Sequence, residues 1–260
     1  MAKKVKLIDV SKCMACRGCQ SACKNWNQLP AEETMFVGTY ENPADLSGIT
    51  WCRVKYNEHV EGDEVRWYFA KYQCMHCTEA ACMNICPANA ISRTSLGTVK
   101  VDADVCVGCG LCKTACPFEV PRIDGTMKKC TRCFDRVSNG MTPACTKACP
   151  TGAITYGDLD DKISEAEARV GALKDKGFAN AQVFGKDELG GLGVIYVLAD
   201  APERYGLPAN PEVSFTTYFW NVALGPVKAL ATVGITMSFM NSFIQKKVQQ
   251  QEEAGKELLG

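Results

Sequence analysis

Sixteen of the 17 cysteines in this 260-residue chain fall into four compact motifs, and their spacing constrains the fold more than any other feature. The motifs, numbered one to four along the chain, are Cys13-x2-Cys16-x2-Cys19-x3-Cys23, Cys74-x2-Cys77-x4-Cys82-x3-Cys86, Cys106-x2-Cys109-x2-Cys112-x3-Cys116 and Cys130-x2-Cys133-x11-Cys145-x3-Cys149. Cysteines three residues apart are poorly placed for a disulfide framework, but they can direct several thiolates at one centre. We therefore expect metal centres in place of disulfides.

The spacing of motif three, with Pro117 after its last cysteine, is the signature of bacterial [4Fe–4S] ferredoxins, and motif one shares this spacing. In such a run the first three thiolates hold one cluster and the fourth holds its neighbour. The four motifs therefore predict four [4Fe–4S] clusters in two ferredoxin-like folds. Zinc sites made of four cysteines are the alternative, since the chain has only His59 and His76, but zinc fits a three-cysteine run followed by a fourth cysteine and proline less well.

Hydropathy patterns outside the motifs predict an α+β protein. Residues 51–56 and 65–72 are rich in β-branched and aromatic residues and flank a turn at 61–63, which predicts a β-hairpin. Residues 160–176 carry apolar side chains at helical spacing, with acidic residues early and lysines late, and predict an amphipathic helix. Further short strands are expected at 5–10, 88–91, 98–101, 151–154 and 194–198.

Cys52 stands apart from the four motifs, within the predicted hairpin. Free cysteine behaves as a small apolar residue, so we expect a buried thiol whose role stays open. Solvated surface positions are expected for the basic residues near the motifs, with offsetting cluster charge or docking a partner as the alternative roles; these residues are Lys12, Arg17, Lys24, Lys113, Lys128 and Lys129. The formal net charge of zero does not favour a nucleic-acid partner.

The C-terminal segment at 215–244 is strongly apolar and carries a single charge, Lys228. A transmembrane helix needs about 20 apolar residues, so composition leaves two alternatives, a membrane anchor and a helix packed against another subunit. Lys246 and Lys247 follow the segment and would place the C-terminus in the cytoplasm. Residues 1–10 contain no apolar run long enough for a signal peptide, so the protein either stays in the cytoplasm or is carried out by a partner.

Several segments outside the cysteine spacing carry a resemblance to a known family. They are Tyr40-Glu-Asn-Pro-Ala-Asp-Leu-Ser, Asp135-Arg-Val-Ser, Ala168-Arg-Val-Gly-Ala-Leu-Lys-Asp-Lys-Gly-Phe and Tyr205-Gly-Leu-Pro. The chain resembles the iron–sulfur beta subunits of molybdopterin oxidoreductases. It is most similar to the beta subunit of membrane-bound respiratory formate dehydrogenase, over nearly its whole length.

The resemblance implies a nested pairing, in which motif one pairs with motif four and motif two with motif three. The implied ligands are Cys13, Cys16, Cys19 and Cys149 for the first cluster; Cys23, Cys130, Cys133 and Cys145 for the second; Cys74, Cys77, Cys82 and Cys116 for the third; and Cys86, Cys106, Cys109 and Cys112 for the fourth. It also implies that the clusters form a wire in that order.

The expected fold is therefore two nested ferredoxin-like folds with a β-hairpin insertion and a C-terminal transmembrane helix. The expected domains are 1–27 with 125–160 for the first ferredoxin-like fold, 28–72 for the insertion, 73–124 for the second ferredoxin-like fold, 161–212 for a helix and strand extension, 213–245 for the anchor and 246–260 for a polar tail.

The resemblance implies a non-catalytic subunit that carries electrons from a molybdenum- or tungsten-containing formate-oxidising alpha subunit to a membrane cytochrome b or another acceptor. The cluster domain is then expected in the periplasm, with the cytoplasm as the alternative. Three other interpretations stay open. The same module could serve a thiosulfate, polysulfide or sulfoxide reductase, the chain could be a zinc-binding scaffold, or it could be a catalytic enzyme in its own right.

Overall fold

The computed structural model describes residues 3–215, 217 and 219. The chain divides into two compact units, residues 1–214 and 215–260. The anchor expected at 213–245 and the tail expected at 246–260 fall almost entirely outside the described residues. Within the described part of the chain, no helix has both the length and the apolar character needed to span a membrane.

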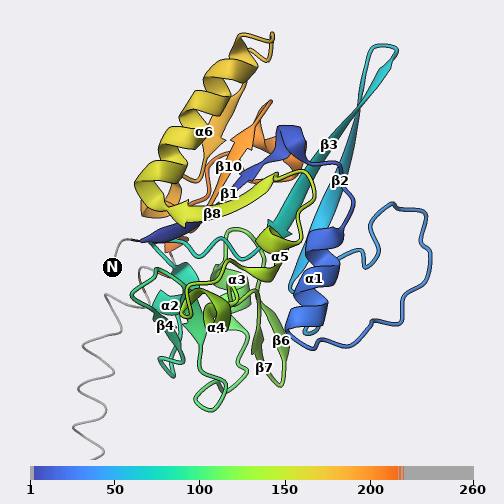
Figure 1. The fold of residues 1–260 in the computed structure, drawn as a ribbon. Coiled ribbons are helices and arrows are strands. Elements are labelled where there is room, and N and C mark those ends of the chain that lie inside the picture. Colours follow the sequence, from blue (N-terminus) through green and yellow to red (C-terminus); the bar gives the residue numbers. More distant parts are fainter. Residues whose placement is uncertain (1–2, 216, 218, 220–260) are drawn as a thin grey trace, which may run out of the picture. The chain divides into compact units, whose positions relative to one another are not determined.

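Short elements connected by long loops make up the first unit (Figure 1). The helices are α1 (Gly18–Trp26), α2 (Ala81–Asn84), α3 (Leu111–Ala115), α4 (Phe134–Val137), α5 (Ala144–Lys147) and α6 (Leu159–Lys174), with 3-10 turns at Val10–Lys12, Glu188–Gly190 and Pro202–Tyr205. The strands are β1 (Lys4–Asp9), β2 (Cys52–Glu61), β3 (Glu64–Gln73), β4 (Ile91–Arg93), β5 (Val99–Val101), β6 (Arg122–Asp124), β7 (Thr126–Lys128), β8 (Ile154–Asp158), β9 (Gln182–Phe184) and β10 (Val194–Leu198).

The main sheet has the strand order β8-β1-β10-β9. Strands β1 and β10 are parallel, with Leu7 opposite Ile195, and the outer pairs are antiparallel. Every residue of β10 is buried, because both faces of the sheet are covered. Figure 1 shows α6 across one face, while the small helices α1 to α5 gather below the sheet.

Helix α6 confirms the amphipathic helix predicted over 160–176. Its buried side chains, Ala166 and Leu173, pack on Val5, Ile195 and Val197 of the sheet. Burying a side chain the size of valine or leucine stabilises the fold by about 1.5–3 kcal/mol. Acidic residues in the first turn and a lysine in the last match the helix dipole.

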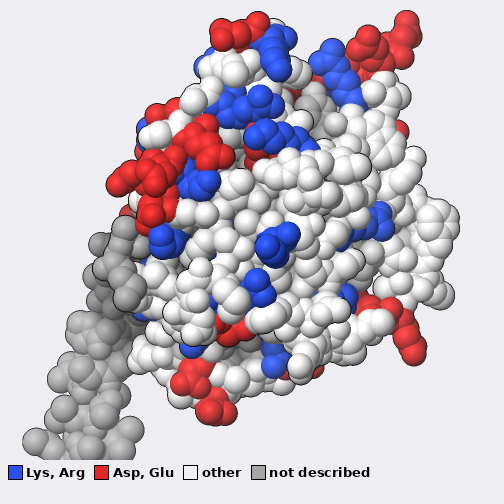
Figure 2. Space-filling model, in the orientation of Figure 1, with Lys and Arg blue, Asp and Glu red and all other residues white. Residues whose placement is uncertain are grey.

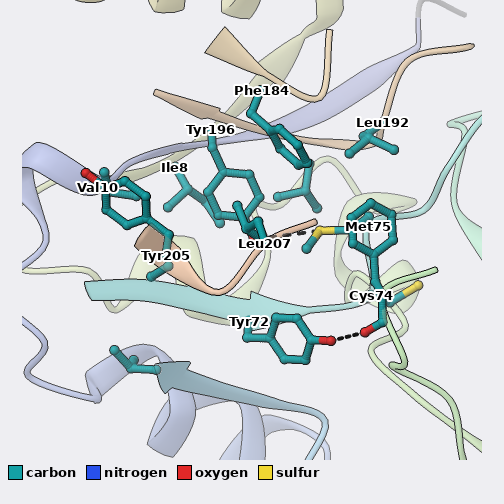
Figure 3. Packing of buried hydrophobic residues seen from close by; sticks show 14 of the residues in the cluster. Ile8, Val10, Tyr72, Cys74, Met75, Phe184, Leu192, Tyr196, Tyr205 and Leu207 are labelled. Carbon is teal, nitrogen blue, oxygen red and sulfur yellow. Dashed lines mark hydrogen bonds between the residues drawn. The ribbon is translucent and has the colours of Figure 1, made fainter. Parts of the chain in front are cut away.

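The other face of the sheet meets the hairpin and the cysteine loops. Figure 3 shows Phe184 and Tyr196 directed from the sheet toward Met75 and Tyr72. The Tyr196 hydroxyl donates to the backbone oxygen of Lys71 at 2.7 Å, and the Tyr72 hydroxyl donates to the backbone oxygen of Phe118. These bonds fix β3 against the sheet on one side and against the loop after motif three on the other.

The predicted hairpin is confirmed as β2 and β3, which pair from Cys52 opposite Gln73 to Glu61 opposite Glu64. Gly62 turns the chain with a φ of 63°, a conformation that glycine adopts readily. The strands expected at 5–10, 98–101 and 194–198 are confirmed as β1, β5 and β10. The segments at 88–91 and 151–154 lead into β4 and β8, whereas β9 and the β6–β7 hairpin were not predicted.

Candidate iron–sulfur cluster sites

Short helices bring the four motifs together in two pairs. Helix α1, which carries Cys19 and Cys23, packs against α5, which carries Cys145. Helix α2, with Cys82, packs against α3, with Cys112. Motif one therefore lies beside motif four and motif two beside motif three, which is the nested arrangement that the resemblance implies.

The loops between cysteines turn through left-handed backbone conformations. Ala15 and Arg132 have φ values of 55° and 56°, which are uncommon for residues with a side chain. Such turns direct amides inward, and the Arg132 backbone N–H donates to the sulfur of Cys130 at 3.3 Å. In motif three, a Cβ on Gly108 would lie 2.3 Å from the backbone oxygen of Gly125, so only glycine fits there. Amides directed at sulfur are the contacts that tune an iron–sulfur cluster.

The first group of thiols surrounds a cavity. Its members are Cys13, Cys16, Cys19 and Cys149, which are the cysteines assigned to the first cluster. The cavity is also lined by Ile8, Val54 and Lys71. The chain thus places four sulfur donors and two cations, Arg17 and Lys71, around a space otherwise bordered mainly by apolar side chains.

The second group of thiols is the most deeply buried. It consists of Cys23, Cys130, Cys133 and Cys145, all four of which are buried. Burial raises the pKa of Cys133 to about 11, and the negative charges of Cys130 and Cys145 add to this rise. A hydrogen bond with Cys52 and burial are the largest causes of the raised pKa of Cys23, and the charge of Cys130 adds to the rise. The four thiols therefore share one environment.

The third and fourth groups form in the same way from motifs two and three. The third consists of Cys74, Cys77, Cys82 and Cys116, and burial followed by the charges of the other three thiols raises the pKa of Cys77. The fourth consists of Cys86, Cys106, Cys109 and Cys112, and the same causes raise the pKa of Cys112 to about 11. In both groups one cysteine comes from the neighbouring motif.

Comparisons with known proteins agree with this geometry. A family model described as "4Fe-4S dicluster domain" matches residues 65–159, which hold motifs two, three and four. The chain is 43% identical over 241 residues to the "Formate dehydrogenase iron-sulfur subunit" of Haemophilus influenzae, an alignment that covers 90% of this chain and 77% of that protein. The chain belongs to the family of formate dehydrogenase iron–sulfur subunits.

Two other relatives of this iron–sulfur subunit extend the comparison. The "Formate dehydrogenase, nitrate-inducible, iron-sulfur subunit" of Escherichia coli is 40% identical over 263 positions, covering 97% of this chain and 90% of that protein. The "Formate dehydrogenase 2 subunit beta (cytochrome c-553)" of Nitratidesulfovibrio vulgaris is 37% identical over 214 residues, covering 78% and 96%. The predicted resemblance is confirmed. The chain is an electron-transfer subunit that binds [4Fe–4S] clusters, and its family implies a catalytic alpha subunit as partner.

Four buried cations of the iron–sulfur subunit show whether the charge around the cysteine groups suits an anionic cluster. They are Lys6, Lys71, Lys129 and Arg132, each at most 5% exposed. Among the described residues none of the four pairs with a carboxylate, and Asp9, the single buried carboxylate there, pairs with Arg169 at 2.9 Å. A buried charge without a counter-charge costs several kcal/mol.

Cysteines supply the missing counter-charge. The charges of Cys145 and Cys130 raise the pKa of Lys6 against the opposing effect of burial. For Arg132 burial prevails and lowers the pKa, although Tyr156 first and then the charges of Cys130 and Cys74 oppose that decrease. A cubane cluster with four thiolate ligands is an anion, so the thiols and cations together match the charge of the cofactor.

A single metal ion fits less well. Within residues 3–215, no three histidine, cysteine, aspartate or glutamate side chains converge closely enough to hold one ion. Zinc–sulfur bonds are about 2.3 Å long, so a zinc site requires thiolates that nearly touch. Thiols spread around a cavity, as in the first group, suit a larger inorganic core.

The sequence interpretation missed three of the buried cations, Lys6, Lys71 and Arg132. Of the basic residues expected at the surface, Lys129 is instead buried, and its ammonium group donates to the backbone oxygen of Val99 at 2.5 Å. The sequence does contain a signal that could have found two of these residues, Lys6 and Lys71. Lys6 and Lys71 each interrupt an otherwise apolar stretch of a predicted strand.

Proposed function

We propose that this subunit holds four [4Fe–4S] clusters and passes electrons through them from a molybdopterin-containing, formate-oxidising alpha subunit to a membrane cytochrome b or another acceptor. Each cluster, when bound, accepts and releases one electron. The protein holds the clusters through the four groups of cysteines defined above, with the first to fourth group holding the first to fourth cluster.

The packing of α1 against α5 and of α2 against α3, together with electrostatic interactions between thiols of successive groups, supports a linear order, and this observation carries the proposal. Three pairs of thiols link successive groups: Cys19 with Cys145, Cys130 with Cys74, and Cys82 with Cys112. In each pair burial raises the pKa of the first thiol, and the charge of the second adds to the rise. The links join the first group to the second, the second to the third and the third to the fourth.

Exposure at the two ends supports the same order. Cys16 of the first group and Cys109 of the fourth are exposed, whereas none of the eight cysteines of the two middle groups is. A wire needs its ends near the surface, where donor and acceptor dock, and its middle shielded. Figure 2 shows acidic and basic side chains together over α6, while the face over α1 and α5 carries scattered basic side chains on a largely uncharged surface. A largely uncharged surface suits contact with another subunit, and Met14, next to Cys13 in sequence, is exposed.

Ligand variants test the crossed assignment. Cys116 lies in motif three but is assigned to the third cluster, with cysteines of motif two. We expect Cys116→Ser and Cys77→Ser to remove the same signal from the EPR spectrum of the reduced complex, and Cys112→Ser to remove a different one. Total iron should fall from about sixteen to about twelve per chain in each case. The assignment is wrong if Cys116→Ser instead removes the signal that Cys112→Ser removes.

The catalytic partner is tested by activity of the purified complex. Formate-dependent reduction of a dye is expected, and dye reoxidation by thiosulfate, polysulfide or a sulfoxide in its place would favour the alternative reductases. Metal analysis separates the zinc scaffold, because that interpretation requires zinc without iron or acid-labile sulfide.

The membrane anchor at 213–245 and a periplasmic cluster domain are also part of the proposal. Their support is the apolar composition of 215–244 and the two lysines after it. The cytochrome c-553 in the name of the N. vulgaris relative indicates that acceptors differ within the family. We expect the complex to sediment with membranes and a chain ending at residue 212 to stay in the soluble fraction. Soluble behaviour of both chains would exclude the anchor.

A further inference from the structure

Gln73, at the end of β3, joins two buried lysines. Its side-chain oxygen Oε1 accepts hydrogen bonds from Lys71 Nζ at 2.7 Å and from Lys6 Nζ at 3.0 Å. All three residues are at most 1% exposed. The sulfur of Cys130 lies 3.9 Å from the same oxygen, in hydrogen-bond geometry. Two ammonium groups thus meet at a neutral side chain beside a cysteine of the second group.

The two lysines face different sets of cysteines. Lys71 lines the cavity of the first group, and it also interacts electrostatically with Cys145 and Cys130 of the second. Lys6 interacts electrostatically with Cys145, Cys130 and Cys133 of the second group and with Cys52, and its side chain hydrogen-bonds Cys145. Lys71 therefore lies between the first and second groups, whereas the grouped cysteines near Lys6 all belong to the second group.

No carboxylate neutralises this pair of charges within residues 3–215. The amide Nε2 of Gln73 also has no hydrogen-bond partner in the described part of the chain. Both features point to an anion nearby that accepts hydrogen bonds. A cluster gains one negative charge on reduction, so a fixed cation beside it stabilises the reduced form more than the oxidised form.

We propose that Lys71 and Lys6, held in place by Gln73, raise the reduction potentials of the first and second clusters, with Lys71 acting on both clusters and Lys6 on the second alone. The lysines are positioning residues that act through their charge and take no part in electron transfer themselves. This inference rests on the ligand groups of the proposed function.

The test is an EPR-monitored redox titration of the complete, anaerobically purified complex. In Lys71→Met, we expect the ratio of reduced to oxidised first and second clusters at a fixed potential to fall about tenfold, which corresponds to about 59 mV for a one-electron couple. In Lys6→Met the second cluster should shift in the same way, and the first should not. Lys71→Arg keeps the charge and should restore both potentials.

Lys186→Met is the matched control, because Lys186 is exposed and pairs with Glu167 on the surface. It should leave all four potentials unchanged. Unchanged first and second potentials in an iron-loaded Lys71→Met complex would overturn the proposal, as would a shift of the first cluster in Lys6→Met. If Lys71→Met does not assemble, Lys6→Met decides, because its effect must be confined to the second cluster. A wild-type complex without four cluster signals would instead contradict the proposed function.

Discussion

The thiol of Cys52 lies among the cluster-binding cysteines without belonging to a group. It is 2% exposed, and its sulfur donates to the backbone oxygen of Cys19 at 3.7 Å. A hydrogen bond with Cys23 lowers the pKa of Cys52 to about 5, against the effect of burial and with the help of Lys71. When Cys23 binds iron it has no proton to donate, so this cause of the low pKa of Cys52 is then absent. The hydrogen bond that Cys52 donates in the structure is to the backbone oxygen of Cys19.

Replacing Cys52 should therefore spare the iron. We expect Cys52→Ala to keep about sixteen irons per chain and Cys23→Ala to fall to about twelve, measured as iron and acid-labile sulfide after anaerobic purification. Cys23 and Cys52 are hydrogen-bonded to each other and both buried, so either substitution disturbs the same part of the core. A difference in iron content between the two variants therefore reports ligation. Equal losses in the two variants would make Cys52 a ligand.

Residue spacing was sufficient to find the sixteen cysteines, because most ligands assigned to one centre follow the chain at short intervals, whereas the pairing of distant motifs came from the family resemblance. Residue spacing was not sufficient for Lys6 and Lys71. A lysine in a strand is normally solvated, and only the layers that cover the strand make it buried. Here the cover comes from the cysteine loops and the opposite strand, which lie far away in sequence.

At the scale of elements, Gly193 lets the main sheet approach motif four. It precedes β10, and a Cβ at this position would lie 1.7 Å from Nη2 of Arg132 and 2.9 Å from the Cβ of His76. Arg132 is fully buried and donates to the backbone oxygen of Lys4 at 2.8 Å, so its guanidinium cannot move aside. The absence of a side chain at Gly193 is therefore a packing requirement.

Gly193→Ala should be strongly destabilising. We expect a loss of about 2 kcal/mol or more from overpacking, seen as a melting temperature several degrees lower by circular dichroism of the iron-loaded protein. Gly171→Ala is the matched control, because Gly171 lies on an exposed turn of α6 with nothing within 4 Å of an added Cβ. It should stabilise the helix by about 0.5–1 kcal/mol. A harmless Gly193→Ala would show that Arg132 can be displaced.

The hydroxyl of Tyr196 is a second link between elements. Tyr196→Phe leaves the buried backbone oxygen of Lys71 without this donor, which should cost about 1–3 kcal/mol. The same melting experiment measures this cost, with Tyr40→Phe as a control because Tyr40 is 56% exposed. Equal melting temperatures in the two variants would mean that another donor reaches the Lys71 oxygen.

Elements with strong local patterns were predictable, and those made by distant pairing were not. Helix α6 and the β2–β3 hairpin follow from apolar spacing and turn residues within one segment. Strand β9 has three residues, too few for a hydropathy pattern, and it forms because its backbone pairs with the edge of β10. The parallel pairing of β1 with β10 joins the two ends of the first unit, which no local signal reveals.

At the scale of the whole molecule, the described residues contain three hydrophobic cores, which are of two kinds. One lies between α6 and the main sheet, includes Leu7, Leu173 and Val197, and contains no cysteine. The other two include cysteines of all four groups. In these cores the hydrophobic contacts and the cluster-binding thiols are the same residues, so their stability depends on the iron.

Removing the iron should therefore unfold the molecule unevenly. Without clusters, Lys71 and Arg132 lose their counter-charge, and buried thiols must take up protons in place of metal. We expect chelation under anaerobic conditions to abolish hydrogen-exchange protection in α1, α2, α3 and α5, while α6 and β10 keep most of theirs, because their shared core holds no ligand. Exchange measured by mass spectrometry before and after chelation separates these segments. Simultaneous loss of protection in α6 and α2 would mean that the first unit folds as one cooperative body around its clusters.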